Sequence, residues 1–130
     1  MWPFSGEKKR VVLIVDDDVN FRTMLAMYFE DMGWEVRQAG NGRQGVDMAV
    51  ASPPDLVLLD IQLPVMSGMI VLTILRANQK AARIPIIMVT AGSGLDDVES
   101  CLAQGANDYI NKPFDFARLK AKVDKLLPQV

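Results

Sequence analysis

The sequence contains no histidine and only one cysteine, Cys101. The lack of histidine excludes Ser-His and Cys-His catalysis and every metal site that needs imidazole. A single cysteine cannot form an internal disulfide. Because Cys101 falls within an apolar helical pattern, we interpret it as a buried, unreactive thiol. Chemistry in this chain must therefore rest on carboxylates, hydroxyls and ammonium groups.

Long apolar runs and large basic clusters are also missing. No run is long enough to span a membrane, and residues 1–7 lack the apolar core of a signal peptide, so we expect a cytoplasmic protein. The net charge is −2, and the only group of three basic residues is Lys8–Arg10. We interpret this group as a solvated approach to a strand, and we expect no direct contact with nucleic acid or membranes.

The 130 residues, half of them hydrophobic, suit one globular domain. We expect a tail over residues 1–8 and a domain over residues 9–128. Short runs of aliphatic and β-branched residues predict five strands, near 11–15, 34–38, 56–59, 84–89 and 108–111. Apolar residues at helical spacing fill the gaps between them, and Asp18, Asn41, Ser67 and Asp115 are the expected helix N-caps.

Strand-helix alternation with short links predicts an α/β fold with a doubly wound parallel sheet. The runs at 11–15, 56–59 and 84–89 are continuously apolar, as is usual for strands buried on both faces. Sites in such sheets form at the carboxyl ends of the strands. The residues that follow each apolar run are therefore the candidates for function.

Five polar residues follow these runs: Asp16, Asp17, Asp60, Thr90 and Lys112. Carboxylates held close together repel one another, and a hard cation relieves the repulsion. Oxygen ligands without histidine or cysteine indicate Mg²⁺, which readily shares its coordination shell with phosphate. Lys112 and Thr90 can contact phosphoryl oxygens, and a carboxylate can itself be the phosphorylated nucleophile. The set predicts a phosphoryl-transfer site.

Four segments, 12–18, 55–68, 88–91 and 111–114, resemble the signature blocks of response-regulator receiver domains. The resemblance runs from about residue 9 to residue 127. It implies a (βα)5 flavodoxin-like three-layer sandwich with a central five-stranded parallel sheet in the strand order 2-1-3-4-5.

The resemblance also implies the roles of the site residues. Asp60 would be the phosphoacceptor. Asp17 and Asp60 would bind Mg²⁺ through their carboxylates and Gln62 through its main-chain carbonyl, whereas Asp16 would hold the ion largely through water. No other cofactor is implied.

Three further residues have implied roles in switching. Lys112 would contact the Asp60 carboxylate and later the phosphoryl oxygens, and its bond to Pro113 would be cis. Thr90 would move to the phosphoryl group, and Tyr109 would move inward with it. The glycine-flanked loop Gly92–Gly94 can supply a mobile element.

A receiver domain accepts its phosphoryl group from a sensor histidine kinase or a phosphotransfer protein and then binds a downstream effector protein. It catalyses only its own phosphorylation and dephosphorylation, so we do not expect an enzyme. We expect a monomer, or a weak homodimer through the face formed by helix four, strand five and helix five. Kinase selection is expected on the first helix and on the loop near residue 114, at Asn20, Thr23, Met24, Met27 and Phe114.

Three alternatives remain open at this point. A receiver-like module that binds partners without phosphate is one, although such modules usually lack a key site residue. An aspartate-nucleophile phosphatase would need an acid two positions after Asp60, where Gln62 stands. A nucleotide- or flavin-binding protein would need a glycine-rich turn after the first strand, where the chain is acidic. Separately, exposed Ile70 and Ile74 could form a strip that docks a partner.

Overall fold

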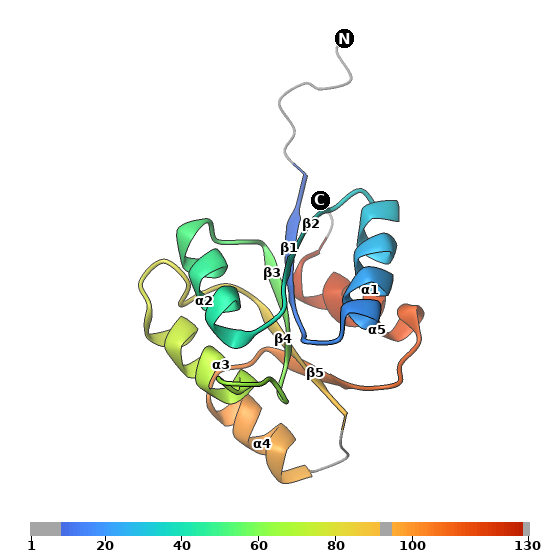
Figure 1. Ribbon diagram of the computed structural model, residues 1–130. Helices are drawn as coiled ribbons and strands as arrows, with labels where there is room; N and C mark the ends of the chain where they lie inside the picture. Colours follow the sequence, from blue (N-terminus) through green and yellow to red (C-terminus); the bar gives the residue numbers. More distant parts are fainter. Residues whose placement is uncertain (1–8, 92–94, 129–130) are drawn as a thin grey trace.

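The computed structural model describes residues 9–91 and 95–128, which form five strands and five helices in alternation (Figure 1). The strands are β1 (Val11–Val15), β2 (Glu35–Ala39), β3 (Leu56–Asp60), β4 (Ile86–Thr90) and β5 (Asp108–Asn111). The helices are α1 (Val19–Asp31), α2 (Gly42–Ala51), α3 (Gly68–Ala77), α4 (Leu95–Ala103) and α5 (Phe116–Leu126). The expected tail, residues 1–8, and the loop Gly92–Gly94 lie outside the described residues.

The five strands form one parallel sheet in the order β2-β1-β3-β4-β5. Helices α1 and α5 lie on one side of the sheet and α2, α3 and α4 on the other (Figure 1). The doubly wound fold and the strand order predicted above are confirmed. Because all strands run in the same direction, their carboxyl ends share one edge of the sheet.

The sheet separates two apolar cores, because successive side chains of a strand point to opposite faces. Val12 and Ile14 of β1 pack with the residues of α1 and α5, whereas Leu13 and Val15 pack with those of α2, α3 and α4. Cys101 is fully buried in the second core, and its Sγ lies 3.1 Å from the Sδ of Met69, so the interpretation of a buried thiol is confirmed.

The four predicted helix caps are confirmed. A side-chain oxygen of each cap residue accepts a hydrogen bond from a backbone N–H in the first turn of its helix, which would otherwise lack a partner. The cap residues are Asp18 for α1, Asn41 for α2, Ser67 for α3 and Asp115 for α5. The loops before these helices are thereby fixed close to the edge of the sheet.

Two strands begin later than predicted, and β2, β3 and β4 each end one residue later than predicted. β2 begins at Glu35 because the backbone N–H of Trp34 donates to the carbonyl of Phe29 and closes the end of α1. β4 begins at Ile86 because the N–H of Ile84 donates back to Ala81 within a turn, and Pro85 has no N–H to contribute.

Two surface features bear on the remaining expectations. Ile70 is half exposed on α3, whereas Ile74 is more covered, so the expected apolar strip is narrower than the sequence indicates. A separate expectation concerns membranes. Among the described residues, no helix combines the length and the apolar character needed to cross a bilayer.

Candidate functional site

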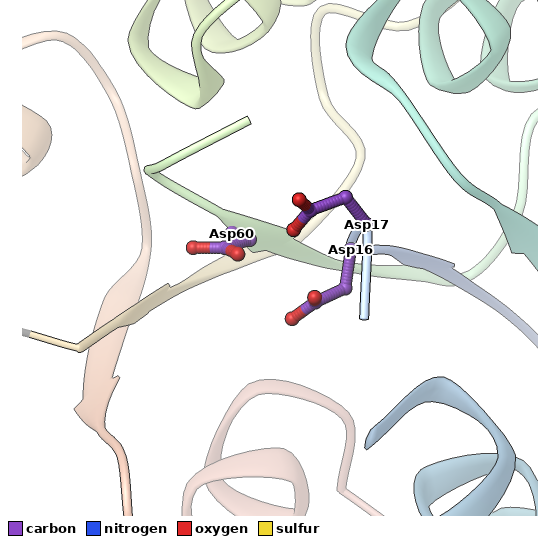
Figure 2. A group of neighbouring side chains, drawn as sticks. All are labelled: Asp16, Asp17 and Asp60. Atoms are coloured by element: carbon purple, nitrogen blue, oxygen red, sulfur yellow. The ribbon is translucent and has the colours of Figure 1, made fainter. Parts of the chain in front are cut away.

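Three carboxylates meet at the carboxyl edge of the sheet. Asp16 and Asp17 directly follow β1, and Asp60 is the last residue of the neighbouring strand β3. One oxygen from each carboxylate lies within 4.8 Å of the other two. Figure 2 shows the three residues side by side, with the carboxylates of Asp16 and Asp17 directed toward the side on which Asp60 lies. The structure therefore brings together the acidic residues that the sequence singled out.

Asp16 is buried, and both of its carboxylate oxygens accept hydrogen bonds. Oδ1 accepts from the backbone N–H of Asp18 at 2.9 Å, and Oδ2 accepts from the Lys112 ammonium at 2.8 Å. The main-chain carbonyl of Asp16 accepts from the guanidinium of Arg22 on α1. Asp16 is thus fixed by three donors, and each of its carboxylate oxygens already accepts one hydrogen bond within the protein.

Asp17 differs from its neighbour in exposure, since its carboxylate faces solvent. Asp60 is buried, with 4% of its surface exposed. Its Oδ1 accepts a 3.0 Å hydrogen bond from the N–H of Gln62. The cluster therefore combines one accessible carboxylate with two buried ones.

Burial raises the pKa of Asp60 to about 6. The carboxylates of Asp16 and Asp17 add to this rise, while the Gln62 N–H and the Lys112 ammonium oppose it. Burial therefore destabilises the ionised form of Asp60, and a further positive charge close to the carboxylate would stabilise it.

Packing beneath Asp60 is tight, because α3 begins directly against the end of β3. A Cβ on Gly68 would overlap the main-chain oxygen of Asp60 and contact Cα of Ile61. The Gly68 N–H also donates to the carbonyl of Ile61 at 2.8 Å. Because residue 68 has no side chain, the first turn of α3 packs directly against the main chain at the end of β3.

Lys112 enters the site from the end of β5. Its ammonium lies 2.8 Å from Asp16 Oδ2 and 3.7 Å from Asp60 Oδ2, so it is closer to Asp16 than to the carboxylate that the resemblance favours. Burial lowers the pKa of Lys112, but the hydrogen bond to Asp16 and the charge of Asp60 outweigh this and raise it. The expected cis bond to Pro113 is present.

The two residues of the expected switch lie on neighbouring strands. Thr90 is buried at the end of β4, and its main-chain carbonyl accepts a 2.7 Å hydrogen bond from the N–H of Lys112. Tyr109 on β5 is half-buried and packs against the core on the α2–α4 side. The Lys122 ammonium lies 5.2 Å from the Tyr109 ring centroid and pairs with Asp108 at 3.0 Å.

Two contacts at the site are not anticipated by the sequence. The ring of Phe21 lies under the Lys112 ammonium, with 4.2 Å between Nζ and the ring centroid. Arg22 reaches from α1 to the carbonyl of Asp16 and to the side chain of Gln38. The spacing of apolar and polar residues in α1 indicates which face of the helix each of these two residues occupies. It does not indicate which groups they contact.

The donor set fits a hard divalent cation. Three carboxylates face one another across less than 5 Å, and one ammonium balances part of their charge. All the ligand atoms are oxygens, as Mg²⁺ and Ca²⁺ prefer. Asp17 is the most exposed of the three carboxylates and is therefore open to an ion from solvent.

A family model described as the response regulator receiver domain matches residues 12–124. The chain belongs to the response regulator receiver domain family. It is thus the receiver domain of a two-component system, a switch that depends on phosphorylation.

The receiver domain is 38% identical over 116 residues to the DNA-binding dual master transcriptional regulator RpaA of Synechocystis sp., a match that covers 89% of this chain and 48% of RpaA. It is 40% identical over 112 residues to the DNA-binding response regulator MtrA of Mycobacterium tuberculosis, covering 86% of this chain and 48% of MtrA. The chain therefore spans about half the length of these curated relatives.

A crystal structure of the receiver domain of sensor histidine kinase PA1611 from Pseudomonas aeruginosa superposes with a TM-score of 0.86 at 31% identity, covering 94% of this chain and all of that one. That structure holds a magnesium ion coordinated in its active-site cleft. Receiver domains thus bind Mg²⁺ in an acidic site, and the present chain carries an acidic cluster of the same kind.

A shallow groove of about 400 Å³ lies between α1 and the start of α5. It includes all four α1 residues that the sequence associates with kinase selection. The lining residues are Asn20, Thr23, Met24, Met27, Tyr28, Asp31 and Phe116.

Proposed function

We propose that Asp60 is the phosphoacceptor of this receiver domain and that Asp17, Asp60 and the main-chain carbonyl of Gln62 hold a Mg²⁺ ion, with Asp16 acting through water. The observation that carries the proposal is the cluster of carboxylates within 4.8 Å, one of them at the end of β3 and in ion-pair contact with Lys112. Bound Mg²⁺ would supply positive charge to the phosphoryl oxygens.

In the proposed reaction, one oxygen of Asp60 attacks the phosphorus of a phosphohistidine on the donor protein. A P–O bond forms as the P–N bond breaks, and the electron pair of the broken bond stays on the imidazole, which takes up a proton. Lys112 balances the negative charge of the phosphoryl oxygens, and the Thr90 hydroxyl donates to one of them. Since residues 1–130 contain no histidine, the phosphohistidine lies outside this domain.

We further propose the partners of this switch. A sensor histidine kinase or phosphotransfer protein docks along the groove between α1 and α5, and an effector reads the surface of α4, β5 and α5, to which Tyr109 belongs. The same surface would support a weak homodimer. Residues 9–128 form the switching unit, and the scattered positive charge and net charge of −2 favour protein partners over direct contact with nucleic acid.

The test uses acetyl phosphate as phosphodonor and intact mass as readout. The wild-type chain is expected to gain one phosphoryl group in the presence of Mg²⁺ and none in EDTA. Asp60→Asn is expected to gain none under either condition. A folded wild-type protein that gains no phosphoryl group would favour the phosphate-independent binding module instead.

A further inference from the structure

The geometry points to Phe21 as a positioning residue for Lys112, and this inference rests on the proposed function of Asp60. We infer that the aromatic face of Phe21, through cation–π attraction, holds the Lys112 ammonium over the acidic cluster and keeps it there as the phosphoryl group arrives.

Three groups surround the Lys112 ammonium. Nζ lies 2.8 Å from Asp16, 3.7 Å from Asp60 and 4.2 Å from the centroid of the Phe21 ring. The last distance is well inside the range of about 6 Å over which a ring attracts a cation. The carboxylates and the ring together therefore fix where this flexible side chain places its charge.

Phe21 is itself held by the loop that carries Lys112. Its ring packs against that of Phe114, with centroids 5.8 Å apart and planes at 86°. The edge-to-face arrangement is a favoured geometry for aromatic pairs. Because Phe114 lies two residues after Lys112, the ring and the ammonium are tied to one short segment, and α1 is linked through it to β5.

The flat face of the Phe21 ring suits a cation that contacts one group before phosphorylation and another group after it. In the structure Lys112 is nearest to Asp16, and in the proposed reaction its ammonium would take up a second position, in contact with phosphoryl oxygens on Asp60. Cation–π attraction extends over the ring face, so Phe21 can retain the ammonium in both positions. An aliphatic residue would fill the same space but would exert no such attraction.

The test varies the electrons of the ring while its shape is conserved. Mono-, di- and trifluorinated phenylalanines placed at position 21 weaken the negative face of the ring in steps. The initial rate of phosphorylation by acetyl phosphate in Mg²⁺ is expected to fall with each step, by about tenfold across the series. The same residues at Phe29, a buried ring on α1 that contacts Tyr28 and Trp34, are expected to leave the rate unchanged.

A second readout needs neither Mg²⁺ nor activity. In the metal-free protein the ε-methylene protons of Lys112 are expected upfield in the NMR spectrum, because they lie near the ring face, and Phe21→Leu is expected to return them toward ordinary positions. Trifluorophenylalanine at position 21 keeps the shape of the ring, so it tests the same contact in a folded protein if Phe21→Leu fails to fold.

The outcomes separate the two claims. A graded loss of rate at position 21 with none at position 29, together with the upfield shift, supports the inference. A flat response at position 21 in a protein that is phosphorylated normally overturns the role of Phe21 and leaves the proposed function intact. A wild-type protein that takes up no phosphoryl group overturns the proposed function, and the inference falls with it.

Discussion

The ammonium of Lys112 donates a 2.8 Å hydrogen bond to Asp16, the buried carboxylate next to the proposed phosphoacceptor. Lys112 therefore acts as a resident cation of the acidic cluster and competes with any metal ion for the same negative charge. Its removal should have opposite effects on metal binding and on phosphoryl transfer.

We predict that Lys112→Met binds Mg²⁺ several-fold more tightly but is phosphorylated at least about tenfold more slowly, because a charge that stabilises the transferring group is lost. Isothermal titration with Mg²⁺ and intact mass after acetyl phosphate measure the two quantities. Lys120→Met, which removes an exposed ammonium paired with Asp124 on α5, is the control and should change neither. A parallel loss of both properties would contradict this role.

The raised pKa of Asp60 predicts a specific pH dependence of stability. Between about pH 4, the ordinary pKa of an aspartate, and pH 6, the folded protein binds more protons at Asp60 than the unfolded chain does. The free energy of unfolding should therefore fall as the pH rises through this window and stay lower above it.

Asp60→Asn should abolish the loss of unfolding free energy that accompanies ionisation of Asp60. In EDTA at pH 8 we expect the variant to be more stable than the wild type by on the order of 2 kcal/mol, whereas near pH 4 the difference should largely vanish. Urea denaturation at both pH values measures it. A variant less stable than the wild type at pH 8 would show that the ionised Asp60 carboxylate does not destabilise the folded protein.

Asp17 is the exposed carboxylate of the cluster and should matter for the ion more than for the fold. We expect Asp17→Asn to weaken Mg²⁺ binding by about tenfold or more while the metal-free stability changes by less than about 0.5 kcal/mol. Asp18→Asn is a close control, because it removes the same charge from the next residue and asparagine still caps α1. Equal losses of affinity in both variants would indicate a general effect of charge.

Val65, in the loop between β3 and α3, is fully exposed and has a φ of 68°. A β-branched residue is disfavoured in this left-handed conformation, at a cost of about 1–2 kcal/mol. Val65→Asn should therefore stabilise the protein by about 1 kcal/mol, as measured by thermal or urea unfolding. Val19→Asn, at an exposed valine in the first turn of α1, should give no such gain.

Much of the fold was predictable because each buried strand reads as an uninterrupted apolar run and each site residue stands where a run ends. Asp60 and Thr90 close β3 and β4, so the topology alone carries them to one edge of the sheet. The caps were predictable for a similar reason, since a short polar residue before an apolar periodic segment has few other roles.

The partners of the side chains were not predictable in the same way. Helical spacing shows that Phe21 faces the protein, but not that an ammonium from β5 lies on its ring. Likewise the sequence places Lys112 near two carboxylates, but Asp16 is its nearest partner because the ammonium lies 2.8 Å from Asp16 and 3.7 Å from Asp60. Boundaries at Trp34 and Pro85 depend on hydrogen bonds of the flanking turns, which no periodicity encodes.

The assignment of Asp60 as the phosphoacceptor is tested most directly by locating the phosphoryl group chemically. The protein is treated with acetyl phosphate and Mg²⁺ and then with borohydride, which reduces an aspartyl phosphate to homoserine, and its peptides are analysed by mass spectrometry. If Asp60 is the phosphoacceptor, homoserine is expected at position 60 and at no other aspartate. Homoserine at position 16 or 17, or none in a folded protein, would contradict the assignment of Asp60 as the phosphoacceptor.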